Sequence, residues 1–252
     1  MKPNIFLLLI DSLREDKFRK FCETHPNSNF KNLMENGIYF SQSISQADAT
    51  LLSLSSIFTG LFPFKTGIRS EKFNKMRSGV NTFFKNLKKS GYNFYGYYPT
   101  VVDLTNILPQ FQNDDSGKFS SPCITKDIDK KIVKLLDNLN SSWFVYLHCM
   151  DLHDPIHIPK KFDDKKIKTT YEKQIMAIDK SLGDIIKKID YIFFKYFFKT
   201  KMITKVYLLT MLMPSLASAS FMLPDNSDFK IQYYNSSTCD NSTSLKNSTF
   251  KS

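Results

Sequence analysis

The chain has 252 residues, of which 42% are hydrophobic and 23% are charged, and its formal net charge is +11. This length suits one large α/β domain or two small ones, with a real hydrophobic core. The lysines are spread along the chain, a pattern that favours a solvated basic surface for anionic substrates over a nucleic-acid-binding tail. We therefore expect no nucleic-acid partner.

The cysteine spacing and the first residues bear on metal or redox sites and on the location of the protein. The cysteines lie at positions 22, 123, 149 and 239 and form no CxxC pair, which argues against a zinc knuckle or a thioredoxin-like site. The first apolar run is too short for a signal peptide and ends at Asp11. The sequence therefore predicts a cytoplasmic location.

Strands and helices are predicted to alternate along the first 190 residues. The predicted strands are residues 4–10, 38–42, 92–98 and 143–149. The predicted helices are residues 13–22, 28–37, 53–59, 79–90, 127–140 and 170–189. This alternation is typical of a mostly parallel sheet covered by helices on both faces.

The character of the sequence changes after Asp190. Residues 191–223 are aromatic and apolar, and within them residues 206–212 make a plausible strand. Residues 206–223 are short for a membrane span and contain Pro214, so a membrane anchor is the weaker alternative there. Residues 224–252 are rich in Ser, Asn and Thr and are predicted to be disordered. We interpret 1–190, 191–223 and 224–252 as three units.

Asp11 is the first candidate site residue. It directly follows the apolar run of residues 5–10, which reads as a buried parallel strand. Ligands in open α/β sheets bind just beyond the carboxyl ends of strands, where Asp11 would hold a metal ion. The alternative is that Asp11 caps the following helix.

Thr50 is the second candidate. It stands in a run of small hydroxyl residues that leads into a short helix ending at Gly60. The free N–H groups at a helix start favour anions, and Thr50 could attack as a nucleophile there if a cation lowers the cost of forming its alkoxide. The alternative is that Thr50 is an N-cap or turn residue.

His153 is the third candidate. It follows the predicted strand at 143–149, near whose end three of the four histidines gather. A histidine there could donate to an anionic oxygen or protonate a leaving group. The alternative is a polar turn with solvated imidazoles.

Six segments, in this order and spacing, resemble the N-terminal part of the sulfatase family within the alkaline-phosphatase superfamily. They are residues 3–14 (the opening strand and aspartate), 25–40 (TPN-x-x-x-LA-x-x-G-V-x-F), 53–67 (S-x-x-S-x-x-TG-x-x-P-x-x-x-G), 87–92 (L-x-x-x-GY), 148–159 (H-x-x-DPH-x-PY-x-P) and 171–183 (Y-x-x-x-I-x-x-x-D-x-x-LG). The resemblance covers residues 3–190.

The resemblance implies an α/β fold, an alkaline-phosphatase-like α/β/α sandwich whose C-terminal part is incomplete here. It implies hydrolysis or transfer at a sulfate or phosphate ester of a small molecule or glycan. Asp11 would hold a divalent cation, Ca²⁺ or Mg²⁺/Mn²⁺. Thr50 would attack the sulfur or phosphorus centre, and His153 would contact the ester oxygens or the leaving group.

The chain also departs from the family pattern. Thr50 replaces the Cys or Ser that sulfatases convert to formylglycine, as in branches that resemble phosphotransferases and phosphodiesterases. Leu54 replaces an Arg or His that would bind the anion. The Asp-His-Gly or Asp-Asn-Gly that completes the metal site is missing after residues 206–212, where Met213 follows.

These losses leave one clear metal carboxylate, and we expect impaired activity, since Ca²⁺ prefers about 6–8 oxygen ligands. Three alternatives to an impaired sulfatase-like enzyme stay open. The first is a non-catalytic truncated or frame-shifted remnant, and the second is a phosphotransferase or phosphodiesterase with a threonine nucleophile. The third is a membrane-associated protein anchored through residues 206–223.

Overall fold

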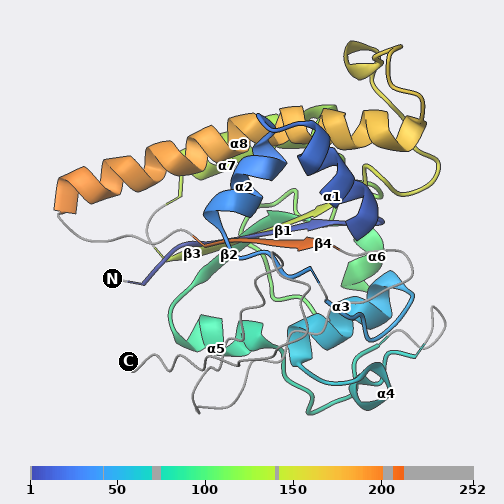
Figure 1. Cartoon of the computed structure of the whole chain (residues 1–252). Helices are drawn as coiled ribbons and strands as arrows, with labels where there is room; N and C mark the ends of the chain where they lie inside the picture. The colour runs from blue at the N-terminus through green and yellow to red at the C-terminus, as the bar shows by residue number, and fades with distance from the viewer. Residues whose placement is uncertain (1, 42, 70–74, 140–141, 201–206, 213–252) are drawn as a thin grey trace, which may run out of the picture.

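The computed structural model of the chain describes residues 2–41, 43–69, 75–139, 142–200 and 207–212 (Figure 1). Its strands form a four-stranded parallel sheet in the order β2-β3-β1-β4. The strands are β1 (Ile5–Ile10), β2 (Asn93–Tyr97), β3 (Trp143–Cys149) and β4 (Tyr207–Leu212). The predicted strands at 4–10, 92–98, 143–149 and 206–212 are therefore confirmed.

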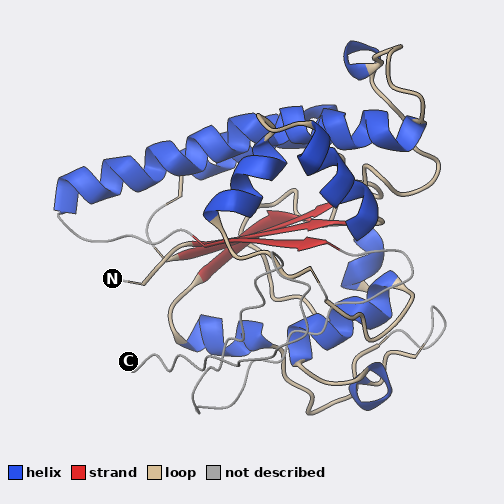
Figure 2. Cartoon of the chain, viewed as in Figure 1, coloured by secondary structure: helices blue, strands red, loops and turns tan. Residues whose placement is uncertain are grey.

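Helices cover both faces of this sheet, which makes three layers (Figure 2). One layer holds α1 (Glu15–Thr24), α2 (Asn29–Asn36), α7 (Asp129–Asp137) and α8 (Thr170–Thr200). The other holds α3 (Thr50–Thr59), α4 (Pro63–Thr66), α5 (Phe83–Lys89) and α6 (Thr100–Asp103). A π-helical turn η1 (Ile124–Ile128) precedes α7, and a 3-10 turn η2 (Lys160–Phe162) lies between β3 and α8.

The two-residue period of the strands divides the core between the layers. In β1, Leu8 and Ile10 pack toward the layer of α1 and α8, whereas Leu7 and Leu9 pack toward α3. Strand β3 lies beside β1 in register, with Leu9 opposite His148 and Ile10 opposite Cys149. Because side chains alternate across a strand, Asp11 and His148 face the α3 layer.

One predicted strand is wrong. Residues 38–41 belong to no strand, and residue 42 is outside the described residues. Ile38 and Phe40 are 61% and 56% exposed, so the alternating apolar positions of this segment face solvent rather than a core. No strand of the described sheet pairs with residues 38–41.

Five of the six predicted helices have different starts; those predicted at 13 and 28 begin at Glu15 and Asn29. Helix α5 begins at Phe83 rather than at residue 79, because Gly79 has a left-handed φ of 86° that a helix does not allow. Helix α7 begins at Asp129, because Asp127 has a φ of 74°. Helix α3 begins at Thr50, three residues before its predicted start at 53.

The predicted boundary at Asp190 falls inside α8, which runs to Thr200 instead of ending at 189. Strand β4 then pairs with β1, with Ile5 opposite Tyr207 and Ile10 opposite Leu212. The rest of the anchor candidate and the polar tail at 224–252 lie outside the described residues, so the three-unit division stays a prediction.

Within the described part of the chain, no helix combines the length and the apolar character needed to cross a bilayer.

Asp179 joins α8 to α2 within the first helical layer. Its carboxylate accepts hydrogen bonds from the backbone N–H groups of Asn29 at 3.2 Å and Phe30 at 2.7 Å, the first two residues of α2. Burial raises the pKa of Asp179, although these bonds and the Asn29 side chain act in the opposite direction. A side chain of α8 thus satisfies the free amides that begin α2.

We expect Asp179→Ala to lower the free energy of unfolding by about 2–3 kcal/mol, because it leaves two amides of α2 without their charged acceptor. Asp184→Ala is the matched control, since Asp184 is 73% exposed on the same helix and its ion pair with Lys187 is 3.8 Å long. That control should change stability by less than about 0.5 kcal/mol. Equal effects of the two substitutions in urea unfolding would contradict the assignment.

Candidate active site

Asp11 lies at the carboxyl end of β1 and is 5% exposed. Its backbone N–H donates to the carbonyl of Cys149 at 2.9 Å, which extends the β1–β3 ladder by one residue. Ser12 then has a left-handed φ of 60° and turns the chain out of the sheet. The side chain of Asp11 is therefore fixed at the sheet edge where ligands bind in open α/β folds.

Tyr171 of α8 holds the turn that follows Asp11. Its hydroxyl donates to the carbonyl of Ser12 at 2.7 Å and accepts from the N–H of Arg14 at 2.8 Å. Arg14 occupies the N-cap position of α1 and makes no side-chain cap bond. Asp11 lies three residues before the N-cap, and its side chain bonds to other segments instead of to the amides of α1. The alternative that Asp11 caps this helix is therefore wrong.

The carboxylate of Asp11 bonds to Thr50 and His148. The Thr50 hydroxyl donates to Oδ2 of Asp11 at 3.0 Å, and Nε2 of His148 lies 3.2 Å from the same oxygen. The Ser12 hydroxyl is 3.3 Å from Oδ1. Three segments far apart in sequence thus meet at one carboxylate: the end of β1, the start of α3 and the end of β3.

Thr50 is the first residue of α3 and is partly buried. Ala49 holds the N-cap position without a side-chain cap bond, so Thr50 is not the N-cap that the alternative required. The loop before it is tied to the helix through Ser53, whose hydroxyl bonds to the carbonyl of Ala47 and to the Ser45 hydroxyl, both at 3.0 Å. These bonds hold the loop against the first turn of α3, where Thr50 lies.

His148 is fully buried and was not among the predicted site residues. Its Nδ1 lies 3.0 Å from the hydroxyl of Tyr146, which is also fully buried. Burial raises the pKa of Tyr146 well above its usual range, so its hydroxyl keeps its proton. In the neutral imidazole, Tyr146 therefore donates to Nδ1, and Nε2 carries the hydrogen that bonds to Asp11.

These contacts keep Asp11 ionised. Burial by itself would raise the pKa of Asp11, but the hydrogen bond from His148, the charge that this imidazole carries when protonated, and the hydrogen bond from Thr50 outweigh it. The charge of His153 acts in the same direction, and the pKa of Asp11 ends below its usual value. The site therefore holds a carboxylate rather than a carboxylic acid at neutral pH.

His153 lies at the rim of the site. Its side chain is exposed, and its Nδ1 bonds to the backbone carbonyl of Asp154 at 2.9 Å. It is near enough to affect Asp11 electrostatically, but no hydrogen bond joins it to Asp11 or Thr50 among the described residues. The structure thus brings two of the predicted residues into contact and places the third at the rim, and their catalytic roles stay predictions.

Leu54 closes the site from the core side. It stands one helical turn after Thr50 and is fully buried with Leu7 and Leu9 of β1. Residues four apart lie on the same face of a helix. Where the resemblance would place a cation beside the nucleophile, this chain therefore has an apolar wall.

The donor set does not fit the expected divalent cation. No group of three or more His, Cys, Asp or Glu side chains that could hold a metal ion occurs in the part of the chain that the structure describes. Asp11 shares one oxygen between Thr50 and His148, whereas Ca²⁺ needs about 6–8 oxygens and Mg²⁺ an octahedral set. The cation thus remains an expectation from the family.

Asp151 does not add a second carboxylate to the site. It follows β3, but it faces the α8 layer and is 3% exposed. Its oxygens accept from the N–H groups of Ile124 at 2.8 Å and Thr125 at 3.1 Å, and from Gln174 at 3.2 Å. Its carboxylate is already occupied in positioning η1.

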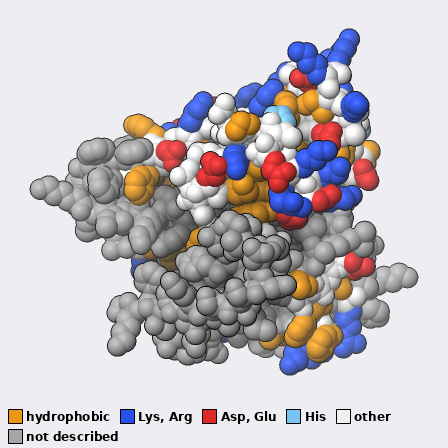
Figure 3. All heavy atoms as spheres, in the orientation of Figure 1, with side chains coloured by type: hydrophobic (Ala, Val, Ile, Leu, Met, Phe, Trp, Pro, Cys, Tyr) orange, Lys and Arg blue, Asp and Glu red, His pale blue; other side chains and the backbone are white. Residues whose placement is uncertain are grey.

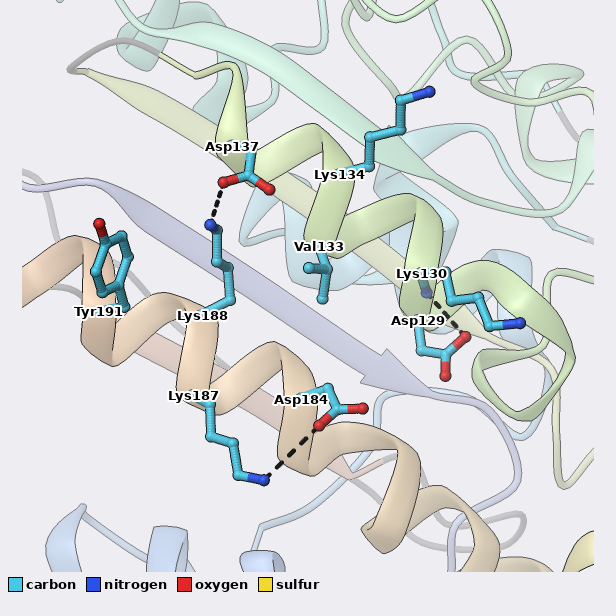
Figure 4. A pocket seen from close by; sticks show the side chains of 9 residues that line it. All are labelled: Asp129, Lys130, Val133, Lys134, Asp137, Asp184, Lys187, Lys188 and Tyr191. Atoms are coloured by element: carbon cyan, nitrogen blue, oxygen red, sulfur yellow. Dashed lines mark hydrogen bonds and ion pairs between the residues drawn. The ribbon is translucent and has the colours of Figure 1, made fainter.

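A hollow of about 680 Å³ lies between α7 and α8, in the helical layer opposite the one that holds α3 (Figure 4). Its lining is charged, and its lysines meet its aspartates: Lys188 pairs with Asp137, and Lys187 lies 3.8 Å from Asp184. The sheet separates this hollow from Thr50, because α7 and α8 pack on the opposite face from α3. It is therefore not part of the candidate site.

The lowered pKa of Asp11 predicts a pH-dependent contribution to stability. An acid whose pKa is lower in the folded state stabilises the fold above its unfolded pKa, about 4, and loses this contribution as pH falls through the folded value. We therefore expect the difference in unfolding free energy between wild type and Asp11→Asn to be largest at about pH 7 and to shrink below about pH 4.

Asp179→Asn is a control for which the stability difference should depend on pH in the opposite direction, because burial raises the pKa of Asp179. The unfolding free energy of wild type, relative to that of Asp179→Asn, should therefore increase as pH falls, because a raised pKa in the folded state costs stability once the group ionises in the unfolded state. Urea unfolding across this pH range measures both. A gap for Asp11→Asn that stays constant or widens on acidification would contradict the assigned contacts.

A family model described as Sulfatase matches residues 3–192. No curated protein matches the chain. The C-terminal periplasmic domain of phosphoethanolamine transferase EptC from Campylobacter jejuni is 18% identical, with a TM-score of 0.56 over 76% of this chain and 64% of that one. The phosphonate monoester hydrolase of Agrobacterium radiobacter is 12% identical, with a TM-score of 0.57 over 76% and 60% of the two chains.

A protein in the alkaline phosphatase superfamily from Vibrio parahaemolyticus is 17% identical, with a TM-score of 0.52 over 75% of this chain and 50% of that one. At such identities the likeness concerns the fold alone, and it confirms the predicted alkaline-phosphatase-like α/β architecture. The chain spans between half and two thirds of the length of these three structures.

Proposed function

Because the chain belongs to the sulfatase family, we propose that it acts on sulfate or phosphate esters with Thr50 as its nucleophile. One observation carries this proposal: the Thr50 hydroxyl, at the first position of α3, donates to a buried carboxylate at the carboxyl edge of the sheet. The hydroxyl is thereby held in one orientation, and the first turn of α3 directs its free amides to the same place.

The reaction starts with attack of Thr50 Oγ1 on sulfur or phosphorus. A bond forms from Oγ1 to the central atom, the hydroxyl proton passes to Oδ2 of Asp11, and the bond to the leaving oxygen breaks. His153, exposed at the rim, gives a proton to that oxygen as it departs. Water or an acceptor alcohol then attacks the same central atom and gives its proton to His153, the bond to Thr50 Oγ1 breaks, and Asp11 returns its proton to Oγ1. The reaction is hydrolysis with water and transfer with an alcohol.

His148 acts through Asp11 in this scheme. Its Nε2–H bonds to the oxygen that also receives the Thr50 proton, and Tyr146 holds the ring from the other side. The imidazole thus keeps the carboxylate oriented and ionised in a site that excludes water on the core side.

The same contacts predict slow turnover. A carboxylate with a lowered pKa is a weak base, and Leu54 contributes no charge to the transferring group. A divalent cation would supply that charge in the family, but the described donor set does not fit one. A domain that binds sulfate or phosphate esters without turnover is therefore the alternative reading, supported by Leu54 and by the single carboxylate.

The identity of residue 50 favours phosphoryl transfer as a second candidate. A threonine cannot be converted to formylglycine, the group with which sulfatases attack, so it must act through its own hydroxyl. The family branches that carry threonine there resemble phosphotransferases and phosphodiesterases. Small-molecule and glycan esters are both compatible with this chemistry.

We expect the purified chain to cleave aryl phosphodiesters or aryl sulfates slowly, and Thr50→Ala to abolish this cleavage, since it removes the only group that attacks. Thr59→Ala is the matched control, because Thr59 lies at the far end of the same helix and its hydroxyl bonds to the carbonyl of Ser55 at 2.6 Å. Release of p-nitrophenol, together with peptide mass spectrometry of Thr50, measures both steps.

Two results would contradict the proposal. Cleavage that is equal in wild type and Thr50→Ala would exclude Thr50 as the nucleophile. Efficient cleavage that needs added Mg²⁺, Mn²⁺ or Ca²⁺ would show that the donor set is more complete than the described residues indicate.

A further inference from the structure

The start of α4 exposes aromatic side chains to solvent. Phe64 is 61% exposed, Phe62 46% and Leu61 36%. The two rings stack on each other with centroids 5.7 Å apart and planes 10° apart. Large apolar side chains grouped at one exposed point mark contact surfaces more often than isolated ones do.

Basic residues lie close to these rings in the sequence. Lys65 follows Phe64 in α4, and Arg69, Lys75 and Arg77 come later in the sequence; all four side chains are exposed. None of the four forms an ion pair among the residues that the structure describes. Residues 61–69 and 75–77, which we call the α4 tip, contain no acidic residue. Figure 3 shows orange and blue side chains side by side at its lower right, where α4 lies.

The α4 tip is held rigidly on the layer of α3. Thr66 is fully buried, and its hydroxyl bonds to Ser55 of α3 at 3.1 Å and to the carbonyl of Pro63 at 2.8 Å. The N–H of Arg77 donates to the carbonyl of Thr66 at 2.7 Å. Gly67 has a left-handed φ of 94°, and a Cβ there would lie 2.9 Å from the Arg77 nitrogen, so only glycine lets the two segments meet. The rings are thus presented outward rather than free to fold back.

We propose that the α4 tip docks the protein onto an anionic lipid surface. Aromatic and aliphatic side chains enter the boundary between headgroups and acyl chains, while lysine and arginine meet the lipid phosphates. The tip combines both requirements, since Phe62 and Phe64 are exposed and its four cations form no ion pair among the described residues.

Other occupants fit the tip less well. Two copies of the chain would bring eight exposed cations together across the contact, which is repulsive. A single-stranded nucleic acid stacks its bases on open aromatic faces, whereas Phe62 and Phe64 already cover one face of each other. Charge complementarity therefore favours a lipid surface.

The experiment is flotation of the full chain with vesicles of phosphatidylcholine alone or mixed with phosphatidylglycerol, at about 0.1 M salt. We expect binding to the anionic vesicles, little binding to the neutral ones, and a loss of binding as salt is raised. Phe62→Ser combined with Phe64→Ser should weaken binding about tenfold or more, because both rings leave the interface. Lys65→Gln combined with Lys75→Gln should weaken it as well.

Ile38→Ser combined with Phe40→Ser is the matched control, since these residues are 61% and 56% exposed elsewhere on the molecule. Circular dichroism checks that all variants fold. The proposal is overturned if wild type does not float with anionic vesicles, or if the control loses as much binding as the double phenylalanine variant. It is also overturned if the phenylalanine variant instead abolishes self-association or binding of a labelled oligothymidine while flotation is unchanged.

Discussion

The buried carboxylate of Asp11 organises the carboxyl edge of this sheet. A carboxylate that is 5% exposed needs donors, and each donor here comes from a different element. Thr50 supplies one from the first position of α3, and His148 supplies another from the penultimate position of β3. The register of β1 on β3 and the exact start of α3 are therefore tied to the same group. Loss of the carboxylate would leave both partners without their acceptor.

Much of this arrangement could be predicted from the sequence. The apolar run before Asp11 ends abruptly, which located the strand end, and the hydroxyl run before Gly60 located a helix start near Thr50. The contact between them was not predictable, because it depends on which face each side chain takes. His148 was missed for the same reason: without the register it is only one of several histidines near a strand end. The alternation Phe144, Tyr146, His148 was a usable signal once β3 was set beside β1.

The wrong predictions share a physical origin. Residues 38–42 alternate like a strand, but a ladder needs a neighbour with free backbone groups, which pattern alone does not provide. The helices predicted at 79 and 127 were placed too early because Gly79 and Asp127 take left-handed conformations that the apolar period does not reveal. Asp179 and Tyr171, which join α8 to α2 and to the turn after Asp11, act across long sequence separations and were equally hidden.

The sulfatase family fold and the local chemistry of this chain do not fully agree. The α/β fold is the one expected for the family, whereas the described part of the proposed site holds a single carboxylate, Asp11, and the uncharged side chain of Leu54 beside Thr50. Helix α3 connects the two surfaces to which we assign functions, with Thr50 at its first residue and the α4 tip just beyond its last. Substitutions in its buried face would thus affect both.

The most direct test of the central contact is a double-mutant cycle between Asp11→Ala and Thr50→Val, measured by urea unfolding at about pH 7. The account predicts that the two substitutions are coupled by about 1–2 kcal/mol, because each removes one side of the same charge-assisted hydrogen bond. The pair Asp11→Ala and Thr59→Val should be additive. Additivity between Asp11 and Thr50 as well would contradict the account, since their side chains would then not be bonded.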